Sequence, residues 1–448
     1  GELYNRRPDV VAFVNGIPLV FLELKAHHRD LRHAYDDNLK DYKDTIPHLF
    51  NTNAFIILSN GLDTNIGTLS SPYKFFHEWK RINEDEVGKI TLDTTIRGTC
   101  SKDKLIDLFE NFIAFEDAGG DIIKILAKNH QYLGVNKVID NAKSLEDLKG
   151  KLGVFWHTQG SGKSYSMLFL SEKIHRKFEG SFTILIVLDR SELETQIYNT
   201  FTAVGAVKEK NLLAKNRDDL KRLLKENHRY VFTLIHKFSI NLKEETDYPL
   251  LNERKDIIVI SDEAHRTQGG VFARNMRFNA LPNASYIGFT GTPIIKGEQE
   301  LTKNIFGEYV SKFMAKDAEW ICLISNDGWW GHTYGHQQLH SYARLRAIEN
   351  RRYIARSANT GISSVINPKG IVEQFLPYSQ KGVINATIFK SDVITFYSKY
   401  GDYIGRLASF LAFVYILQLI IFYIMIINFF SYVIDPPIFC VNKYMSRS

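Results

Sequence analysis

The sequence predicts an α/β protein with a parallel sheet in its central part and a long apolar helix near its C-terminal end. Three observations predict this class. Between residues 152 and about 313, short apolar runs alternate with amphipathic segments, which is typical of a parallel sheet covered by helices on both faces. A small-residue loop ending in Gly-Lys-Ser separates the first apolar run from a helix-like segment. Residues 407–434 contain no charged side chain.

Composition and charge argue against a disulfide scaffold and against a global basic field over the first 318 residues. The 448 residues contain 44% hydrophobic and 24% charged residues, as in an ordinary folded protein of about two to four domains. Most of the net charge of +6 comes from residues 319–448, so any nucleic-acid path before them must be a local patch. The three cysteines lie far apart and suit a reducing compartment. The chain starts at Gly1 without a signal peptide, and we expect that its natural beginning lies further upstream.

The first 95 residues predict an α/β domain. Apolar runs at 10–14 and 19–25 flank Asn15-Gly16, which favours a hairpin with a two-residue turn. A polar helix is expected at about 31–43, and a buried strand at 54–59. Residues 100–150 are charged and have a helical pattern, which predicts a helical connector.

The next segment predicts the strands of the parallel sheet. The first strand is expected at 152–156 and a helix follows at 165–174. Further strands are expected at 182–188, 230–235, 257–260 and 285–289. We see no internal repeat or low-complexity tract.

The loop 157–164 predicts a phosphate-binding site. Glycines allow backbone N–H groups to turn toward phosphates, a lysine reaches the β- and γ-phosphates, and a serine hydroxyl ligates Mg²⁺. His157 stands where the usual pattern begins with glycine, and a flexible turn is the alternative interpretation. The candidate nucleotide-binding residues are Thr158, Gly160, Ser161, Gly162, Lys163 and Ser164.

A second motif supports ATP and Mg²⁺ as cofactors. Asp262-Glu263-Ala264-His265 follows directly after the apolar run 257–260. Carboxylates at the end of a buried strand hold Mg²⁺ and orient water in enzymes that hydrolyse nucleotides. We therefore expect Asp262 to bind the metal together with Ser164, and Glu263 to orient the attacking water.

A third constellation predicts a metal-dependent nuclease. Asp9 and Glu23 lie on strands that the predicted hairpin makes neighbours, so their carboxylates can converge on one divalent metal. Lys25 shares a strand face with Glu23 and can position or help deprotonate the attacking water. The alternative is a surface strand with an ordinary Glu–Lys pair.

These motifs, in this order, resemble the motor (R) subunit of type I restriction enzymes. The segment from Arg7-Pro8-Asp9 through Glu23-Leu24-Lys25 is similar to the family's nuclease motif. His130-Gln131-Tyr132 resembles its adenine-reading segment, and the loop at 156–164 is similar to its phosphate loop, histidine included. Matches continue, in order, at Asp189-Arg190, 233–238, 262–265 and 288–293.

The resemblance implies three parts in residues 1–315. They are a restriction-endonuclease-like nuclease domain at 1–95, a connector at 96–150 with Gln131 binding adenine, and the first RecA-like helicase lobe at 151–315. It implies ATP-driven translocation of double-stranded DNA and Mg²⁺-dependent cleavage in the restriction of foreign DNA. The implied partners are methyltransferase and specificity subunits, and the implied location is the cytoplasm.

The sequence departs from this family's pattern at two places. The family's Gln-x-x-x-Tyr after the nuclease lysine is Asn38-Leu39-Lys40-Asp41-Tyr42 here, so the resemblance adds Tyr42 to the catalytic residues, with a shorter amide before it. An early acidic residue that the family has before Asp9 is not identifiable.

From about residue 317 the sequence resembles a different family. The segments 324–331, 343–349 and 356–363 are similar to the carboxyl-terminal part of apolipoprotein N-acyltransferase, which implies a partial nitrilase-like segment at 317–403 and a transmembrane helix at 404–434. Cys322 lacks the context of that family's nucleophile, whose other catalytic residues lie upstream of the match.

The chain thus reads as a chimera of two families. No motif of a second RecA-like lobe follows residue 316. The alternatives are a membrane-anchored acyltransferase remnant that contacts the membrane through residues 407–434, and an ATP-binding module without turnover.

Overall fold

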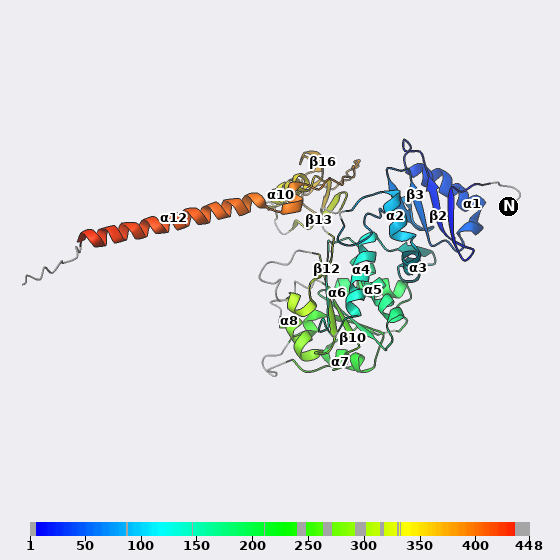
Figure 1. Cartoon of the computed structure of the whole chain (residues 1–448), viewed down its shortest axis with the longest axis horizontal. Coiled ribbons are helices and arrows are strands. Elements are labelled where there is room, and N and C mark those ends of the chain that lie inside the picture. The colour runs from blue at the N-terminus through cyan, green and yellow to red at the C-terminus, as the bar shows by residue number, and fades with distance from the viewer. Residues whose placement is uncertain are drawn as a thin grey trace, which may run out of the picture. The chain divides into compact units, whose positions relative to one another are not determined.

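The computed structural model divides the chain into two compact units, Gly1–Met314 and Ala315–Ser448, and each is described by itself. The described residues are 6–86, 88–145, 147–209, 211–239, 248–262, 271–291, 302–313, 318–328, 331 and 333–434. Figure 1 shows the elements along the chain.

The first unit begins with a four-stranded sheet. Its strands are β1 (Val10–Val14), β2 (Ile17–Leu24), β3 (Phe55–Ser59) and β4 (Thr64–Gly67), in the order β1-β2-β3-β4. Val14 pairs with Ile17, and both turn residues have positive φ, 49° at Asn15 and 80° at Gly16. This is the two-residue turn that favours an Asn-Gly sequence, so the predicted hairpin is confirmed.

Short helices cover one face of this sheet (Figure 1). They are η1 (Ala34–Leu39, a π-helix), α1 (Lys40–Thr45), η2 (Pro47–Phe50) and η3 (Tyr73–Phe75). Buried Phe21 and Leu58 of the sheet pack here against Leu39 and Tyr42. The expected helix at 31–43 is therefore present, as a π-helical turn that continues into an α-helix.

The connector contains a hairpin that the sequence analysis missed. Its elements are α2 (Leu92–Thr99), α3 (Lys102–Asn111), β5 (Ile113–Asp117), β6 (Ile122–Leu126) and α4 (Asn129–Ala142). The helical pattern expected at 100–150 is confirmed at α3 and α4, but it is wrong at residues 113–117 and 122–126, which form strands. Two short runs of apolar and β-branched residues pair here because Gly119 and Gly120 reverse the chain with φ of 82° and 108°.

A six-stranded sheet follows, as predicted from the alternating apolar runs. Its strands are β7 (Lys151–His157), β8 (Thr183–Leu188), β9 (Tyr230–Leu234), β10 (Ile257–Ser261), β11 (Ser285–Thr290) and β12 (Tyr309–Phe313). They lie in the order β12-β7-β11-β10-β8-β9, and every neighbouring pair is parallel. The parallel sheet is thereby confirmed.

Helices bury both faces of this sheet, which explains why its strands are continuous apolar runs. The helices are α5 (Lys163–Lys177), α6 (Ser191–Ala203), α7 (Arg217–Lys225), η4 (Ile235–Phe238), α8 (Val271–Arg274) and η6 (Asn275–Ala280). Along β8, Ile184 and Ile186 belong to the core that contains α5, whereas Leu185 and Val187 belong to the core that contains α7.

The second unit has a mixed four-stranded sheet. Strands β13 (Ile321–Ser325) and β14 (Ile354–Ala358) are parallel and are joined by α10 (Gly335–Asn350). Antiparallel β15 (Ser363–Ile366) and β16 (Val372–Leu376) complete the sheet. The buried core is small: Ala343 and Ala347 of α10 pack on Ile354 and Ile366.

Buried charged groups hold this small unit together. Arg356 and Asp327 form an ion pair of 2.7 Å, and both side chains are fully buried. The guanidinium of Arg352 donates to the carbonyl oxygens of Ala318 and Val393, so it ties the segment before β13 to the segment before α11 (Phe396–Tyr400). Residues 324–331 and 356–363 were matched to the second family without a role for any of them. In the structure, Asp327 and Arg356 are the two partners of the buried ion pair.

The chain continues into the long helix α12 (Tyr403–Ile434). Its part Tyr403–Ile426 is long and apolar enough to cross a membrane, and none of it is buried within the structure. This observation rests only on the length and the composition of the helix.

Candidate functional site

The nuclease candidates lie together where β1 and β2 meet the helices that cover them. Val10 pairs with Leu22 across the hairpin, so Asp9 stands opposite Glu23. Asp9 Oδ2 accepts a hydrogen bond of 2.8 Å from the backbone N–H of Leu24. The hairpin therefore fixes the Asp9 carboxylate beside β2, close to Glu23, as the sequence predicted.

Glu23 is the centre of this group. Its side chain is 1% exposed, and Oε1 accepts hydrogen bonds from Lys25 Nζ at 2.8 Å and from Asn38 Nδ2 at 2.5 Å. Its other oxygen, Oε2, is buried and has no hydrogen-bond partner among the described residues. Burial raises the pKa of Glu23; Lys25 opposes this shift and nearby Asp9 adds to it.

The amide and the tyrosine that the resemblance indicated both reach this site. Asn38 lies in η1 and Tyr42 one helical turn later in α1, so both face Glu23. The shorter side chain of Asn38 still bonds to Glu23, so the departure from the family's glutamine does not break this contact. Tyr42 donates to the carbonyl oxygen of Arg7 at 3.2 Å, and burial raises its pKa.

The nucleotide candidates surround the loop between β7 and α5. Gly162 precedes the first residue of α5 in a left-handed conformation, with φ of 88° and ψ of 35°. This turn starts the helix at Lys163 and Ser164, so the helix N-terminus faces the loop that Thr158 and Gly160 form. Ser161 is 5% exposed, and its hydroxyl has no hydrogen-bond partner among the described residues.

Lys163 lies where three parallel strands end. Its Nζ is 3.9 Å from Oδ1 of Asp262, which follows β10. It also lies near Gly291, which follows β11: a Cβ at that glycine would be 3.1 Å from Nζ. The structure thus places the phosphate-loop lysine close to Asp262, and the joint binding of a metal by Ser164 and Asp262 stays a prediction. Glu263, Ala264 and His265 lie outside the described residues.

Gln131 contacts the phosphate loop directly. Its Nε2 donates to the carbonyl oxygen of Gly162 at 2.8 Å, and its Oε1 accepts from the backbone N–H of Lys128 at 2.7 Å. Neighbouring His130 Nε2 lies 2.9 Å from the carbonyl oxygen of Ser161. Burial lowers the pKa of His130 to about 3, so it is a neutral donor to the loop. The start of α4 therefore holds the loop from one side.

A buried hydrogen-bonded chain supports the base of the loop. His157 Nε2 lies 2.8 Å from Ser311 Oγ of β12, and Ser311 Oγ donates to Glu84 Oε1 at 2.9 Å. Burial lowers the pKa of His157 and raises that of Glu84. His157 was expected as a departure from the usual glycine pattern that the resembled family shares, without a structural role. No sequence pattern indicated Ser311 or Glu84, which are far from the loop in sequence.

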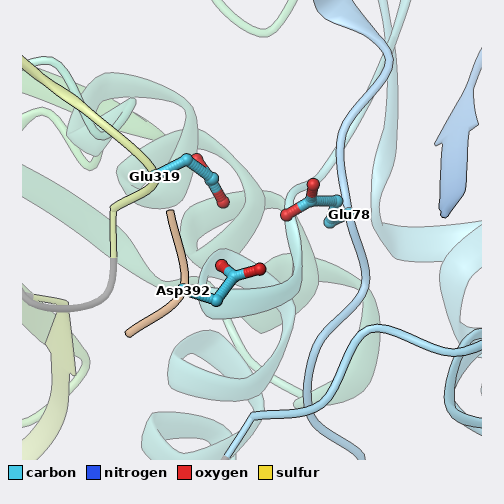
Figure 2. A group of neighbouring side chains, drawn as sticks. All are labelled: Glu78, Glu319 and Asp392. Atoms are coloured by element: carbon cyan, nitrogen blue, oxygen red, sulfur yellow. The ribbon is translucent and has the colours of Figure 1, made fainter. Parts of the chain in front are cut away.

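A pair of carboxylates lies in the second unit. Figure 2 shows Glu319, before β13, and Asp392, before α11. Their carboxylate oxygens lie within 4.8 Å of each other. The backbone N–H of Ser391 donates to the carbonyl oxygen of Glu319 at 3.2 Å. Glu78, also labelled there, belongs to the first unit and forms an ion pair of 3.2 Å with Lys80. We assign no metal centre to these residues.

Three family models match the chain. Residues 2–75 match the N terminus of type I restriction enzyme R protein, and residues 130–320 match the SWI2/SNF2 ATPase. Residues 301–397 match the carbon-nitrogen hydrolase model and overlap most of the nitrilase-like segment predicted at 317–403. These matches support the description of the chain as a chimera.

Curated relatives agree with the first two matches. The endonuclease subunit of type I restriction enzyme HindI from Haemophilus influenzae is 41% identical over 340 residues, which are 70% of this chain and 32% of the relative. A type I restriction enzyme endonuclease subunit from Staphylococcus saprophyticus is 28% identical over 71% of this chain and 34% of the relative. The chain thus spans about a third of the length of these relatives.

Among solved structures, the UvsW helicase from bacteriophage T4 aligns over 47% of this chain and 67% of its own. The identity is 16% and the TM-score 0.32, so this likeness carries no argument about function.

Proposed function

We propose, from the homology of residues 1 to about 315 to endonuclease subunits of type I restriction enzymes, that the first unit carries the nuclease site and first ATPase lobe of such a subunit. The observation that carries this proposal is the group around Glu23. A hairpin, a π-helical turn and an α-helix bring four further residues to one buried carboxylate: Asp9, Lys25, Asn38 and Tyr42.

The residues of this group fit a divalent metal. Glu23 Oε2 is a buried acceptor with no partner among the described residues, beside a second carboxylate on Asp9. Carboxylate oxygens are the ligands that Mg²⁺ prefers. A bound Mg²⁺ would supply Lewis-acid assistance to hydrolysis of a phosphodiester. Lys25, which Glu23 holds at 2.8 Å, would orient the attacking water, and Tyr42 would keep bulk water from one side of the carboxylate.

The phosphate loop fits ATP in complex with Mg²⁺. Backbone N–H groups at the start of α5, Lys163 and the buried hydroxyl of Ser161 provide donors for an anionic phosphate chain. Ser164 and Asp262 would hold the metal, and Glu263 would orient water. Gln131 would contact the adenine base; its amide already bonds to the loop, so base binding and loop geometry would be linked.

In the intact complex, ATP hydrolysis would drive movement along double-stranded DNA and the nuclease site would cut it. Sequence choice would come from a specificity subunit, with a methyltransferase subunit as the second partner. The nuclease and ATPase parts would act in the cytoplasm.

Cleavage of plasmid DNA by the purified full chain tests the nuclease assignment. We expect nicking or cutting that requires Mg²⁺, is lost in Glu23→Ala and Lys25→Ala, and is retained in Glu110→Ala. Glu110 is the control because it also pairs with a lysine, Lys177, at 2.6 Å, but lies on α3, which carries none of the candidate nuclease residues. Full activity of Glu23→Ala would refute the metal assignment.

Nucleotide binding and turnover test the second site separately. We expect the chain to bind ATP in the presence of Mg²⁺ and Lys163→Ala to abolish that binding. Turnover should be slow because the arginine of a second lobe, which typically contributes about 10³-fold or more, has no motif in residues 317–448. DNA-stimulated turnover at the rate of an intact translocase would contradict this expectation.

A second proposal concerns α12, which we propose to be a membrane anchor. The 24 residues Tyr403–Ile426, none of which is buried, extend over about 36 Å as a helix, more than the roughly 30 Å of a bilayer's hydrocarbon core. The full chain should float with lipid vesicles in a density gradient, and a chain that ends at residue 402 should not. Equal flotation of both would refute the anchor.

A further inference from the structure

A cluster of cationic side chains directly follows β2, the strand that carries Glu23. We call residues 25–33 the basic turn; its potential cations are Lys25, His27, His28, Arg29, Arg32 and His33. The turn closes with a hydrogen bond of 2.9 Å from the backbone N–H of Arg29 to the carbonyl oxygen of Ala26. The first residue of the basic turn, Lys25, contacts Glu23, so the turn begins at the candidate nuclease site.

A buried asparagine holds the basic turn in place. Asn60 is 6% exposed, and its Nδ2 donates to the carbonyl oxygen of Arg29 at 2.9 Å. Its Oδ1 accepts from the backbone N–H groups of Leu62 and Asp63 at 3.0 and 2.7 Å. Because β2 and β3 are parallel, the turn after β2 and the loop after β3 meet at one edge of the sheet. The turn thus has a defined position beside the nuclease site.

The cations of the basic turn divide into two groups. Lys25 pairs with Glu23, Arg32 with Asp36 and His33 with Asp37. The exposed residues His27, His28 and Arg29 form no ion pair within the described part of the chain. The rings of His27 and His28 contact each other, with centroids 5.4 Å apart.

We propose that His27, His28 and Arg29 bind the phosphate backbone of DNA next to the phosphate that is cleaved. This inference rests on the proposed nuclease function. DNA presents about one negative charge per 1.7 Å of its axis, so a duplex at Glu23 places further phosphates within reach of the neighbouring turn. Phosphate contacts position a protein without reading sequence, as suits a nuclease whose sequence choice lies in another subunit. Arg29 supplies the permanent charge.

Salt dependence of DNA binding tests this surface. The full chain, in mild detergent and EDTA to prevent cleavage, is titrated with a duplex of about 30 base pairs at several salt concentrations. In Arg29→Ala, the slope of log K against log salt should fall in magnitude by about 0.9, the value for one lost phosphate contact. Arg29→Lys should restore the slope, and circular dichroism should show the same fold for all variants.

Arg97→Ala provides the matched control, since Arg97 is an exposed arginine whose Asp93 partner lies 3.7 Å away on α2. Its slope should equal that of the parent chain. In Mg²⁺, Arg29→Ala should raise the KM for cleavage and leave kcat unchanged, which a structural defect of the nuclease centre would not do.

The outcomes separate this inference from the function beneath it. If the parent chain cuts DNA and Arg29→Ala keeps its slope and KM, the proposed surface is refuted while the nuclease stands. If the slope falls in Arg29→Ala but the parent chain never cuts with Mg²⁺, the nuclease assignment fails and the DNA contact stands.

Discussion

The two glycines of the phosphate loop allow the contact between Gln131 and the loop to be measured. Gly160 and Gly162 both have left-handed backbones, with φ of 79° and 88°. A Cβ at Gly160 would meet nothing within 4 Å, whereas one at Gly162 would lie 2.7 Å from Nε2 of Gln131. Alanine at Gly160 therefore measures backbone strain alone, and alanine at Gly162 measures strain plus displacement of Gln131.

The magnitudes follow from these two differences. Left-handed backbone costs alanine about 1–2 kcal/mol, so Gly160→Ala should lower the free energy of unfolding by that amount. Gly162→Ala should cost about 1 kcal/mol more, because the flexible end of Gln131 moves away and its hydrogen bond to Gly162 is lost. In a Gln131→Ala background, this extra cost should vanish and both glycine substitutions should cost the same.

Urea unfolding of the full chain, followed by tryptophan fluorescence, provides the assay, since the midpoint at constant slope reports stability. The double-mutant cycle between Gly162 and Gln131 isolates their interaction. Equal costs for Gly160→Ala and Gly162→Ala in the parent chain would refute the reasoning. So would a cost of Gly162→Ala that does not depend on Gln131.

Three further predictions concern buried polar groups. Without metal at neutral pH, Glu23→Gln should raise the urea midpoint. Because burial raises the pKa of Glu23, its contribution to stability is present below the ordinary carboxyl pKa and is lost as pH rises through the raised value. Mg²⁺ should stabilise the parent chain and not this variant. Asn129→Ala should cost about 1–3 kcal/mol in the same assay, because Asn129 bonds to both backbone groups of Arg81 at 3.0 and 2.8 Å. Asp327→Ala should destabilise the second unit by about 3–5 kcal/mol, since it leaves a buried charge on Arg356; hydrogen exchange of β14 should then approach that of the unfolded chain.

Sequence patterns predicted those elements that are determined by residues close together in the chain. The Asn15-Gly16 turn depends only on the positive φ angles of its own two residues. The parallel strands could be recognised as continuous apolar runs because helices bury both of their faces. The hairpin β5–β6 escaped prediction because its strands are only partly buried and are surrounded by charges, so the helical pattern of their neighbours dominated. Boundaries of the nuclease, connector and helicase parts stay predictions.

The candidate sites divide in the same way. Asp9, Glu23 and Lys25 could be grouped because a hairpin has a fixed register and strand residues two apart share a face. The bond from Asn38 to Glu23 could not be predicted from the side chain's length alone, because it depends on how η1 packs on the sheet. Contacts between residues far apart in sequence, such as Ser311 with Glu84, carry no local signal at all.

These long-range contacts tie the phosphate loop to the segment that follows the nuclease sheet. Residues 81–84 are held at one end by Asn129, which precedes the two α4 residues that contact the loop. At the other end, Glu84 accepts from Ser311, which His157 contacts from the base of the loop. Each of these bonds lies in a partly or fully buried setting, where an unpaired polar group costs about 1–3 kcal/mol. Any shift of the loop relative to residues 81–84 must therefore break several such bonds together or carry the segment with it.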